Sequence, residues 1–247
     1  MIGKAKSIQH TSISVDYARL KKYGEEIGRK HLAGITGRDI AREFRLCQNL
    51  NTKCVNNTLR VILSPTIEDG QKLSNDDLRC IYEDYLRKMN LNEHQSIAFV
   101  HRDKAHTHIH IYINRIDFEG KAYDDSYISN RTARIAEEIA IERGLKTARE
   151  VQMQKLVSNM DIKEEIKHRH KVAMQTKPKS LKEYIDIMRA NKVNIEVVQS
   201  KTGKVSGIRM EFQGNVFKAS DIDRRLSYNN LIKEINIASK NTLKREL

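Results

Sequence analysis

The sequence predicts an α+β protein: a two-layer sandwich around a central antiparallel sheet with helices packed on it, followed by a smaller C-terminal α+β appendage. Three observations predict this class. Short β-rich runs such as NTLRVILS (57–64) alternate with helical segments. The short polar link RDKAH joins two strand candidates, 95–101 and 107–114, as in an antiparallel hairpin. Near residue 150 the sequence changes to a long charged segment typical of a helix. We therefore expect a core domain over 1–150 and a basic appendage over 151–247.

Local signals mark the ends of these elements. Thr36 and Ser74 are candidate N-caps, and Asp77 completes a capping-box-like pattern with Ser74. Pro65 ends a strand, and Gly144 stops a helix. The expected strands are 4–10, 57–64, 95–101, 107–114, 193–200 and 205–212, and the expected helices are 14–31, 36–48, 75–89, 129–143, 148–175, 179–190 and 228–240.

Composition narrows the function classes. The 247 residues carry a formal net charge of +13, which suits a polyanionic partner such as nucleic acid. No apolar run approaches the ~20 residues of a spanning helix, and no secretory signal opens the chain, so we expect a cytoplasmic protein without membrane insertion. The cysteines Cys47, Cys54 and Cys80 form no CxxC pair, and we expect them to be reduced.

The most informative segment is HRDKAHTHIHIYIN, residues 101–114. Side chains alternate along a strand, so His106, His108 and His110 share one face, and the isoleucines between them take the opposite, core face. We therefore expect the histidines on an exposed or cleft-facing surface, with His101 across the hairpin as a third ligand for a metal. Asp103 is placed to orient one imidazole. A solvated histidine-rich strand face is the alternative.

The spaced set His101, Asp103, His108, His110 and Asn114 resembles the metal motif of relaxases, the mobilisation nucleases of plasmids and integrative elements. These are histidine–hydrophobe–histidine (HUH) endonucleases, and His108-Ile109-His110 is the HUH element here. The sequence is most similar to P-type mobilisation relaxases of Bacteroides-type mobilisable elements, over most of residues 1–145 and weakly to about 235.

The resemblance implies a metal site and a nucleophile. It maps the ligands onto His101, His108 and His110, with His106 as an alternative ligand, and it implies Mn²⁺ or Mg²⁺, although imidazoles could also hold Zn²⁺. It implies a catalytic tyrosine near the N-terminus, for which Tyr17 fits the family position and Tyr23 is the runner-up. A phenol needs a base or a nearby cation to become a nucleophile near neutral pH.

The expected partner is single-stranded DNA with an adjacent duplex or hairpin at a transfer origin, together with accessory mobilisation proteins and a coupling protein. Ser64 matches a serine that relaxases place near the scissile phosphate; a strand-end hydroxyl bonded to the backbone is the alternative. The basic clusters of the appendage are expected to clamp phosphates, or else to form a solvated face. The full set of expected DNA contacts is Ser64, Arg19, Lys21, Lys22, Asn114, Arg115, Lys167, Arg169 and Lys171.

Three other functions stay open at this point. An HUH replication initiator or transposase carries its tyrosine after the histidines, and Tyr123 and Tyr127 lie there. A non-catalytic module would bind metal and DNA without a covalent adduct. A zinc hydrolase is weaker, because the HExxH signature and a convincing general base are missing.

Overall fold

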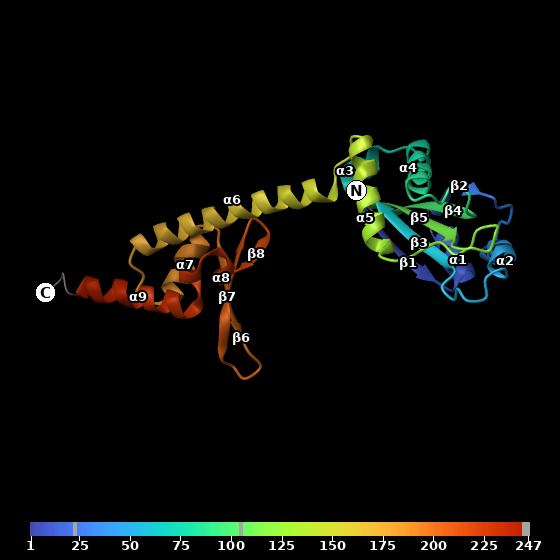
Figure 1. Cartoon of the computed structure of the whole chain (residues 1–247). Coiled ribbons are helices and arrows are strands. Elements are labelled where there is room, and N and C mark those ends of the chain that lie inside the picture. Colours follow the sequence, from blue (N-terminus) through green and yellow to red (C-terminus); the bar gives the residue numbers. More distant parts are fainter. Residues whose placement is uncertain (22–23, 104–105, 244–247) are drawn as a thin grey trace. The chain divides into compact units, whose positions relative to one another are not determined.

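The structure is a computed structural model that describes residues 1–21, 24–103 and 106–243. It divides into two compact units, Met1–Gln152 and Met153–Leu247. Each unit has its own sheet and its own apolar core (Figure 1). The expected α+β class, with a central antiparallel sheet and a second, smaller sheet, is confirmed.

The first unit is built on a five-stranded sheet of order β1-β3-β5-β4-β2, in which every neighbouring pair is antiparallel. The strands are β1 (Ile2–Ile8), β2 (Gly24–Lys30), β3 (Thr58–Ser64), β4 (Ser96–Asp103) and β5 (His106–Asn114). Strands β4 and β5 form the expected hairpin and are longer than predicted at its turn. The segment His108-Ile109-His110 therefore lies on the central strand of the sheet.

Helices cover both faces of this sheet (Figure 1). On one face, α4 (Asn75–Lys88) and α5 (Ile128–Glu142) pack over a core that includes Val61, Ile109 and Ile111. On the other face, α1 (Thr11–Leu20) and α2 (Gly37–Gln48) cover a smaller core of the β4–β5 hairpin. The β1–β3 edge of this second face contributes only Ile8 to that core.

The capping signals in the sequence set the helix boundaries. Thr36 and Ser74 each form a capping box, with Asp39 and Asp77 respectively, as a helix start requires. Gly144 follows α5 with φ of +64°, the left-handed conformation that glycine adopts at helix ends. One short helix, α3 (Ile67–Lys72), was not expected; Thr66 caps it.

The expected helix over 14–31 is wrong in its second half. Helix α1 ends at Leu20, and Gly24–Lys30 forms the edge strand β2, which pairs with β4. Ile27 is the one residue of this strand that is fully buried. The strand therefore lacks the alternation of apolar and polar residues by which a strand is recognised in a sequence. A Cβ at Gly28 would lie 2.7 Å from the Tyr82 ring, so tertiary packing requires glycine here and overrides the helical pattern.

The second unit holds a three-stranded antiparallel sheet, β6 (Asn194–Gln199), β7 (Val205–Phe212) and β8 (Asn215–Lys218). Its helices are α6 (Ala148–Gln175), which begins in the first unit, α7 (Leu181–Ala190), α8 (Ala219–Ile222), a 3₁₀ turn (Arg224–Leu226) and α9 (Tyr228–Leu243). Tyr184, Met210 and Leu231 are among the residues of its core. Strand β8 was not expected. No helix in the described ranges is long and apolar enough to cross a membrane.

Candidate active site

The histidines of the hairpin lie on the sheet face that α1 and α2 cover. In the β4–β5 register His101 pairs with His108, and Phe99 pairs with His110. Phe99 and the nearby Tyr112 belong to the core under α1 and α2. The histidines were expected on an exposed or cleft-facing surface, and their burial differs along it. His101 is fully buried, His108 and His110 are partly buried, and His106 alone is exposed, because helices pack on both faces of the sheet.

His101 is held in one tautomer. Its Nε2 lies 2.7 Å from the carbonyl oxygen of Ala18 in α1, and a carbonyl can only accept, so Nε2 carries the proton. The other ring nitrogen, Nδ1, is buried and has no hydrogen-bond partner among the residues that the structure describes. A backbone carbonyl bonded to one ring nitrogen is the usual way in which a protein orients a metal-binding imidazole.

His110 lies beside His101, with 4.3 Å between the two ring centroids and 38° between the ring planes. Burial lowers the pKa of His110 to about 3, with further lowering from the neighbouring His101 and His108 and from the cations of Lys21 and Arg60. His110 is therefore neutral near neutral pH. Two imidazoles in contact, one of them with a buried nitrogen that has no partner among the described residues, form a donor pair that fits a metal ion.

His108 and His106 lie farther along the same strand. The His108 ring centroid is 6.4 Å from that of His110, and His106 stacks on His108 at 5.9 Å. Nδ1 of His108 lies 2.7 Å from Oγ of Ser64, at the end of β3. Ser64 therefore bonds to a histidine of the cluster, and not to the backbone as the alternative interpretation held.

The side chains of the cluster are of the type that binds metal ions, but the distances between them do not yet form a metal site. In the described ranges, no group of three or more His, Cys, Asp or Glu side chains is already arranged to hold a metal ion. The contact pair His101–His110 and the buried, unpartnered Nδ1 are what favour a metal here. A third imidazole from His108 would have to move toward this pair.

Tyr17 lies on the exposed side of α1. It precedes Ala18, whose carbonyl bonds to His101 of the cluster. Its side chain is 62% exposed, and Nζ of Lys21 lies 5.8 Å from its ring centroid. The neighbouring residue, Ala18, accepts the hydrogen bond from His101. One helix thus carries the exposed phenol and also fixes the buried imidazole.

The other residues of the first unit that were expected to contact DNA differ in how far their side chains are already engaged within the protein. Arg19 is bound to Asp16, with 3.2 Å between Nε and Oδ1. Asn114 is fully buried, and its amide donates to Phe44 and Gln95, so the expected DNA contact is replaced by an internal role. Arg115 is likewise mostly buried. Its guanidinium bonds the backbone carbonyls of Asn56 and Tyr123 and pairs with Asp125. Lys22, Tyr23 and the Asp103 side chain lie outside the part of the chain that the structure describes.

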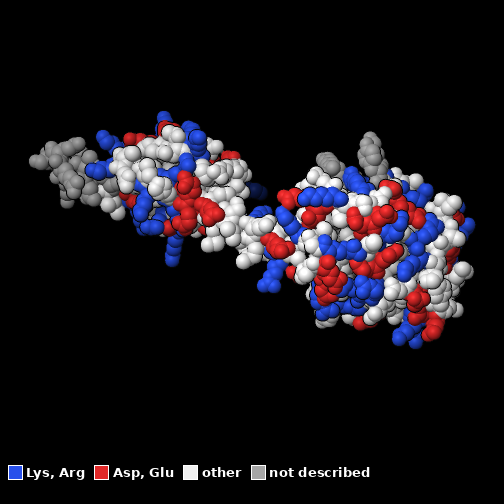
Figure 2. Space-filling model, turned by 90° about the horizontal axis from the view of Figure 1, so that it is seen from above, with Lys and Arg blue, Asp and Glu red and all other residues white. Residues whose placement is uncertain are grey.

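Two of the three expected contacts in the second unit are engaged within it. Lys167 pairs with Glu164 at 2.6 Å. Arg169 pairs with Glu165 at 2.7 Å, and its guanidinium lies 4.4 Å from the Phe212 ring centroid. Lys171 is exposed. Figure 2 shows Lys and Arg side chains interspersed with Asp and Glu over the visible face of both units.

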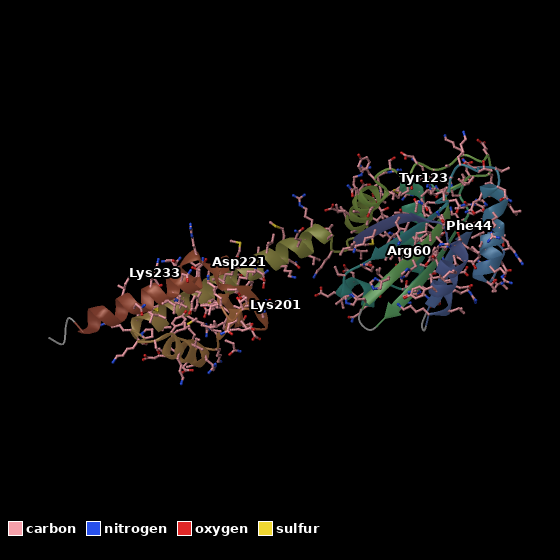
Figure 3. The ribbon with its side chains drawn as sticks, turned by 90° about the horizontal axis from the view of Figure 1, so that it is seen from below. Phe44, Arg60, Tyr123, Lys201, Asp221 and Lys233 are labelled. Atoms are coloured by element: carbon pink, nitrogen blue, oxygen red, sulfur yellow. The ribbon has the colours of Figure 1, made fainter. Side chains whose placement is uncertain are left out.

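Sequence reasoning missed a set of cations on the histidine face. Arg60 (labelled in Figure 3) pairs across the strands with Tyr112, and Ile62 pairs with His110. On the edge strand, Lys6 pairs with Arg60 and Lys4 pairs with Ile62. These cations line a recess of about 280 Å³ together with Ala5, Ile62 and Ser129. The signal was present in the alternation of KAK at 4–6, which the strand period places on one face.

The first unit is thus an α+β domain with a hairpin that carries four histidines and a tyrosine on the neighbouring helix α1. The family model "Relaxase: MobA/VirD2-like, nuclease domain" matches residues 16–145, more than half of the chain, and the chain belongs to this relaxase family. It therefore carries the nuclease domain of a DNA relaxase. The matched region contains Tyr17 and all four histidines of the cluster. No curated protein and no solved structure matches the chain.

Proposed function

We propose that this chain nicks single-stranded DNA at the transfer origin of a plasmid or mobilisable element by tyrosine transesterification. Tyr17 is the nucleophile, and His101, His108 and His110 hold a divalent ion, Mn²⁺ or Mg²⁺. One observation carries the proposal: the buried His101, with an unpartnered Nδ1, is bonded to the carbonyl of Ala18, next to an exposed tyrosine on the same helix.

The reaction exchanges one phosphodiester for another. The hydroxyl oxygen of Tyr17 forms a bond to the scissile phosphorus while the bond to the 3′ oxygen breaks. The phenolic proton is lost, and the departing 3′ oxygen takes up a proton. The strand is left with its 5′ phosphate on Tyr17 and a free 3′ hydroxyl. Because the number of phosphoester bonds is unchanged, attack by a 3′ hydroxyl on the phosphotyrosine reseals a strand at the same site.

Residues of the chain supply positive charge and fixed geometry for this exchange. Lys21 lies over the Tyr17 ring, and the charges of Lys21 and Arg60 help to lower the pKa of His110, which supports a role for both cations beside the phosphate of a bound strand. Ala18 fixes the tautomer of His101, and Ser64 bonds to His108. A divalent ion held by His101, His108 and His110 would supply the charge that offsets the negative charge of the scissile phosphate.

The tyrosines that follow the histidines are less suited to the reaction. The Tyr123 hydroxyl donates to the carbonyl of Met89, and its ring packs against the core under α4 and α5, on the opposite face of the sheet. Tyr127 is exposed just before α5, also a helix of that face. These positions favour Tyr17 over the replication-initiator chemistry.

The proposal is tested by incubating the protein and Mn²⁺ with end-labelled single strands from the transfer origin of its own element. We expect a covalent protein–DNA band that survives denaturation in the wild type and in Tyr127→Phe. The band should be absent in Tyr17→Phe, which keeps the ring and removes only the hydroxyl. DNA binding without any adduct would support the non-catalytic module in place of the nickase.

A further inference from the structure

A second recess of the first unit lies at the N-terminal end of α1, and the proposed cleavage chemistry does not use it. Its volume is about 670 Å³, within the range of pockets that bind small ligands. Its walls come from the β1–α1 link, the first turn of α1, the C-terminal half of α2 and the loop that follows α2.

The rim of this recess carries side chains that recognise nucleobases. Arg45 and Asn49 are exposed and four residues apart at the end of α2, so they are neighbours on the helix surface. Arginine makes paired hydrogen bonds to O6 and N7 of guanine, and asparagine makes the same kind of pair to N6 and N7 of adenine. Further polar groups in the walls belong to Gln9, His10, Ser12, Thr52 and Asn57.

The floor of the recess is fixed before any ligand enters. The buried Gln48 donates to the carbonyl of Asn57 at 3.3 Å and to Oδ1 of Asn114 at 3.2 Å. The Asn51 amide donates to the carbonyl of Gly120 at 2.9 Å, and its Oδ1 accepts from the Cys54 amide at 3.2 Å. These amides hold the loop in shape, and a preformed recess loses little conformational entropy on binding.

An exposed apolar stripe on α1 leads from this recess to Tyr17. Ile13, Tyr17 and Leu20 lie on one side of the helix and are 73%, 62% and 68% exposed. Ile13 also lines the recess. The helix rises about 6 Å between Ile13 and Tyr17, which corresponds to roughly two stacked nucleotides at 3.4 Å each. Apolar and aromatic surfaces of this kind stack with the bases of single strands.

We infer that the recess binds one purine base of the substrate strand, within a few nucleotides of the phosphate at Tyr17, and that Arg45 and Asn49 recognise it. The inference rests on the proposed function, because it takes single-stranded DNA as the ligand. It assigns part of the sequence specificity of nicking to the end of α2, outside the histidine cluster.

The test measures binding by fluorescence anisotropy, with the divalent metal chelated so that no strand is cut. The probes are short polythymidine strands, either uniform or with a single central dG or dA. The wild type should bind the purine-containing strands roughly tenfold more tightly than uniform polythymidine. Arg45→Ala should remove the advantage of dG, and Asn49→Ala the advantage of dA.

Matched controls come from the same segments. Arg42→Ala removes an exposed cation one turn earlier on α2, and Asn56→Ala removes an exposed amide of the same loop; neither residue lines the recess. Both variants should keep the purine advantage. Equal binding of all strands by the wild type, or an advantage that survives in Arg45→Ala and Asn49→Ala, would overturn the inference.

Adduct formation separates this inference from the proposed function. If the recess does not bind a purine, the wild type still forms the Tyr17 adduct, and Arg45→Ala forms it with unchanged base preference around the nick. If Tyr17 is not a nucleophile, no adduct appears, yet the purine advantage and its loss in the two variants remain.

Discussion

Each unit of the chain holds a histidine largely shielded from solvent, fully buried at His101 and half-buried at His170, but the ring nitrogens of the two have different surroundings. In the first unit, Nδ1 of His101 is buried without a partner among the described residues. In the second unit, Nδ1 of His170 lies 2.9 Å from the Tyr184 hydroxyl, and Nε2 lies 3.6 Å from Glu234. His170 thus has both ring nitrogens next to polar partners of its own unit, whereas the buried Nδ1 of His101 is a polar atom whose lack of a partner needs an explanation, which the proposed metal supplies.

The basic residues of the two units differ in the same way. Lys167 and Arg169 are one helical turn from the glutamates that they pair with, so their charge is largely compensated within α6. In the first unit, Lys4 and Arg60 lie on a strand face where the period of two brings cations together without acidic neighbours among the residues that line the recess. Secondary structure therefore decides how much of a basic sequence is available to DNA.

The largest expected effect separates His101 from His170. His101→Ala removes the unpartnered nitrogen and should reduce nicking by more than about 100-fold, the loss that even a supporting group of a metal site can cause. His170→Ala should leave nicking per folded molecule unchanged. The measurement is the nicking rate of each variant at matched folded concentration, with circular dichroism as the check on folding. Comparable losses of nicking in both variants would show that the two histidines do not differ in the way proposed.

A smaller effect on nicking is expected when the hydroxyls of Ser64 and Thr176 are removed and compared. Ser64→Ala removes the partner of His108 and should lower metal affinity or the nicking rate by about tenfold. Thr176→Ala removes a hydroxyl that donates only to the carbonyl of Ala173 in α6, and it should have no effect on nicking. Titration with Mn²⁺ distinguishes the outcomes: in Ser64→Ala, excess metal should restore part of the activity. An unchanged Mn²⁺ dependence would show that Ser64 does not support the site.

The buried amide of Asn114 predicts an effect on stability. Asn114→Ala removes one hydrogen-bond acceptor of the buried Gln48 amide and the donor to Oε1 of Gln95, and it should lower the free energy of unfolding by about 1–3 kcal/mol. Asn191→Ala, which loses a half-buried bond at the end of α7, should cost less. Urea unfolding followed by circular dichroism measures both. A loss of DNA affinity in Asn114→Ala without a loss of stability would restore the DNA-contact role.

The smallest expected effect concerns salt. With roughly five phosphates neutralised on a single strand, log affinity should fall with log salt at a slope of about −3.5. Arg60→Gln should reduce the magnitude of this slope by about 0.7, the share of one phosphate. Lys167→Gln should change it little, because Glu164 already pairs with that cation. Affinity measured over a salt series checks this, and a larger change in Lys167→Gln would place DNA on the second unit.

Much of this arrangement could be predicted from the sequence because its signals are local. Capping residues such as Thr36 and Ser74 defined helix starts, and the strand period placed three histidines of β5 on one side. The edge strand β2 was missed, since the requirement for glycine at position 28 comes from Tyr82, far away in sequence. The bond between His101 and Ala18, and the burial of Asn114, depend on how α1 and α2 pack, which no local pattern encodes.

Peptide mapping of the covalent adduct tests the central claim most directly. The wild-type protein is allowed to react with a cognate single strand, and protease and nuclease digestion is followed by mass spectrometry of the nucleotide-bearing peptide. The account predicts a nucleotide on Tyr17, joined through its 5′ phosphate. A nucleotide on Tyr23 would contradict the assignment of the residue, one on Tyr123 or Tyr127 would move the chemistry to the opposite face of the sheet, and the lack of any modified tyrosine would contradict the mechanism.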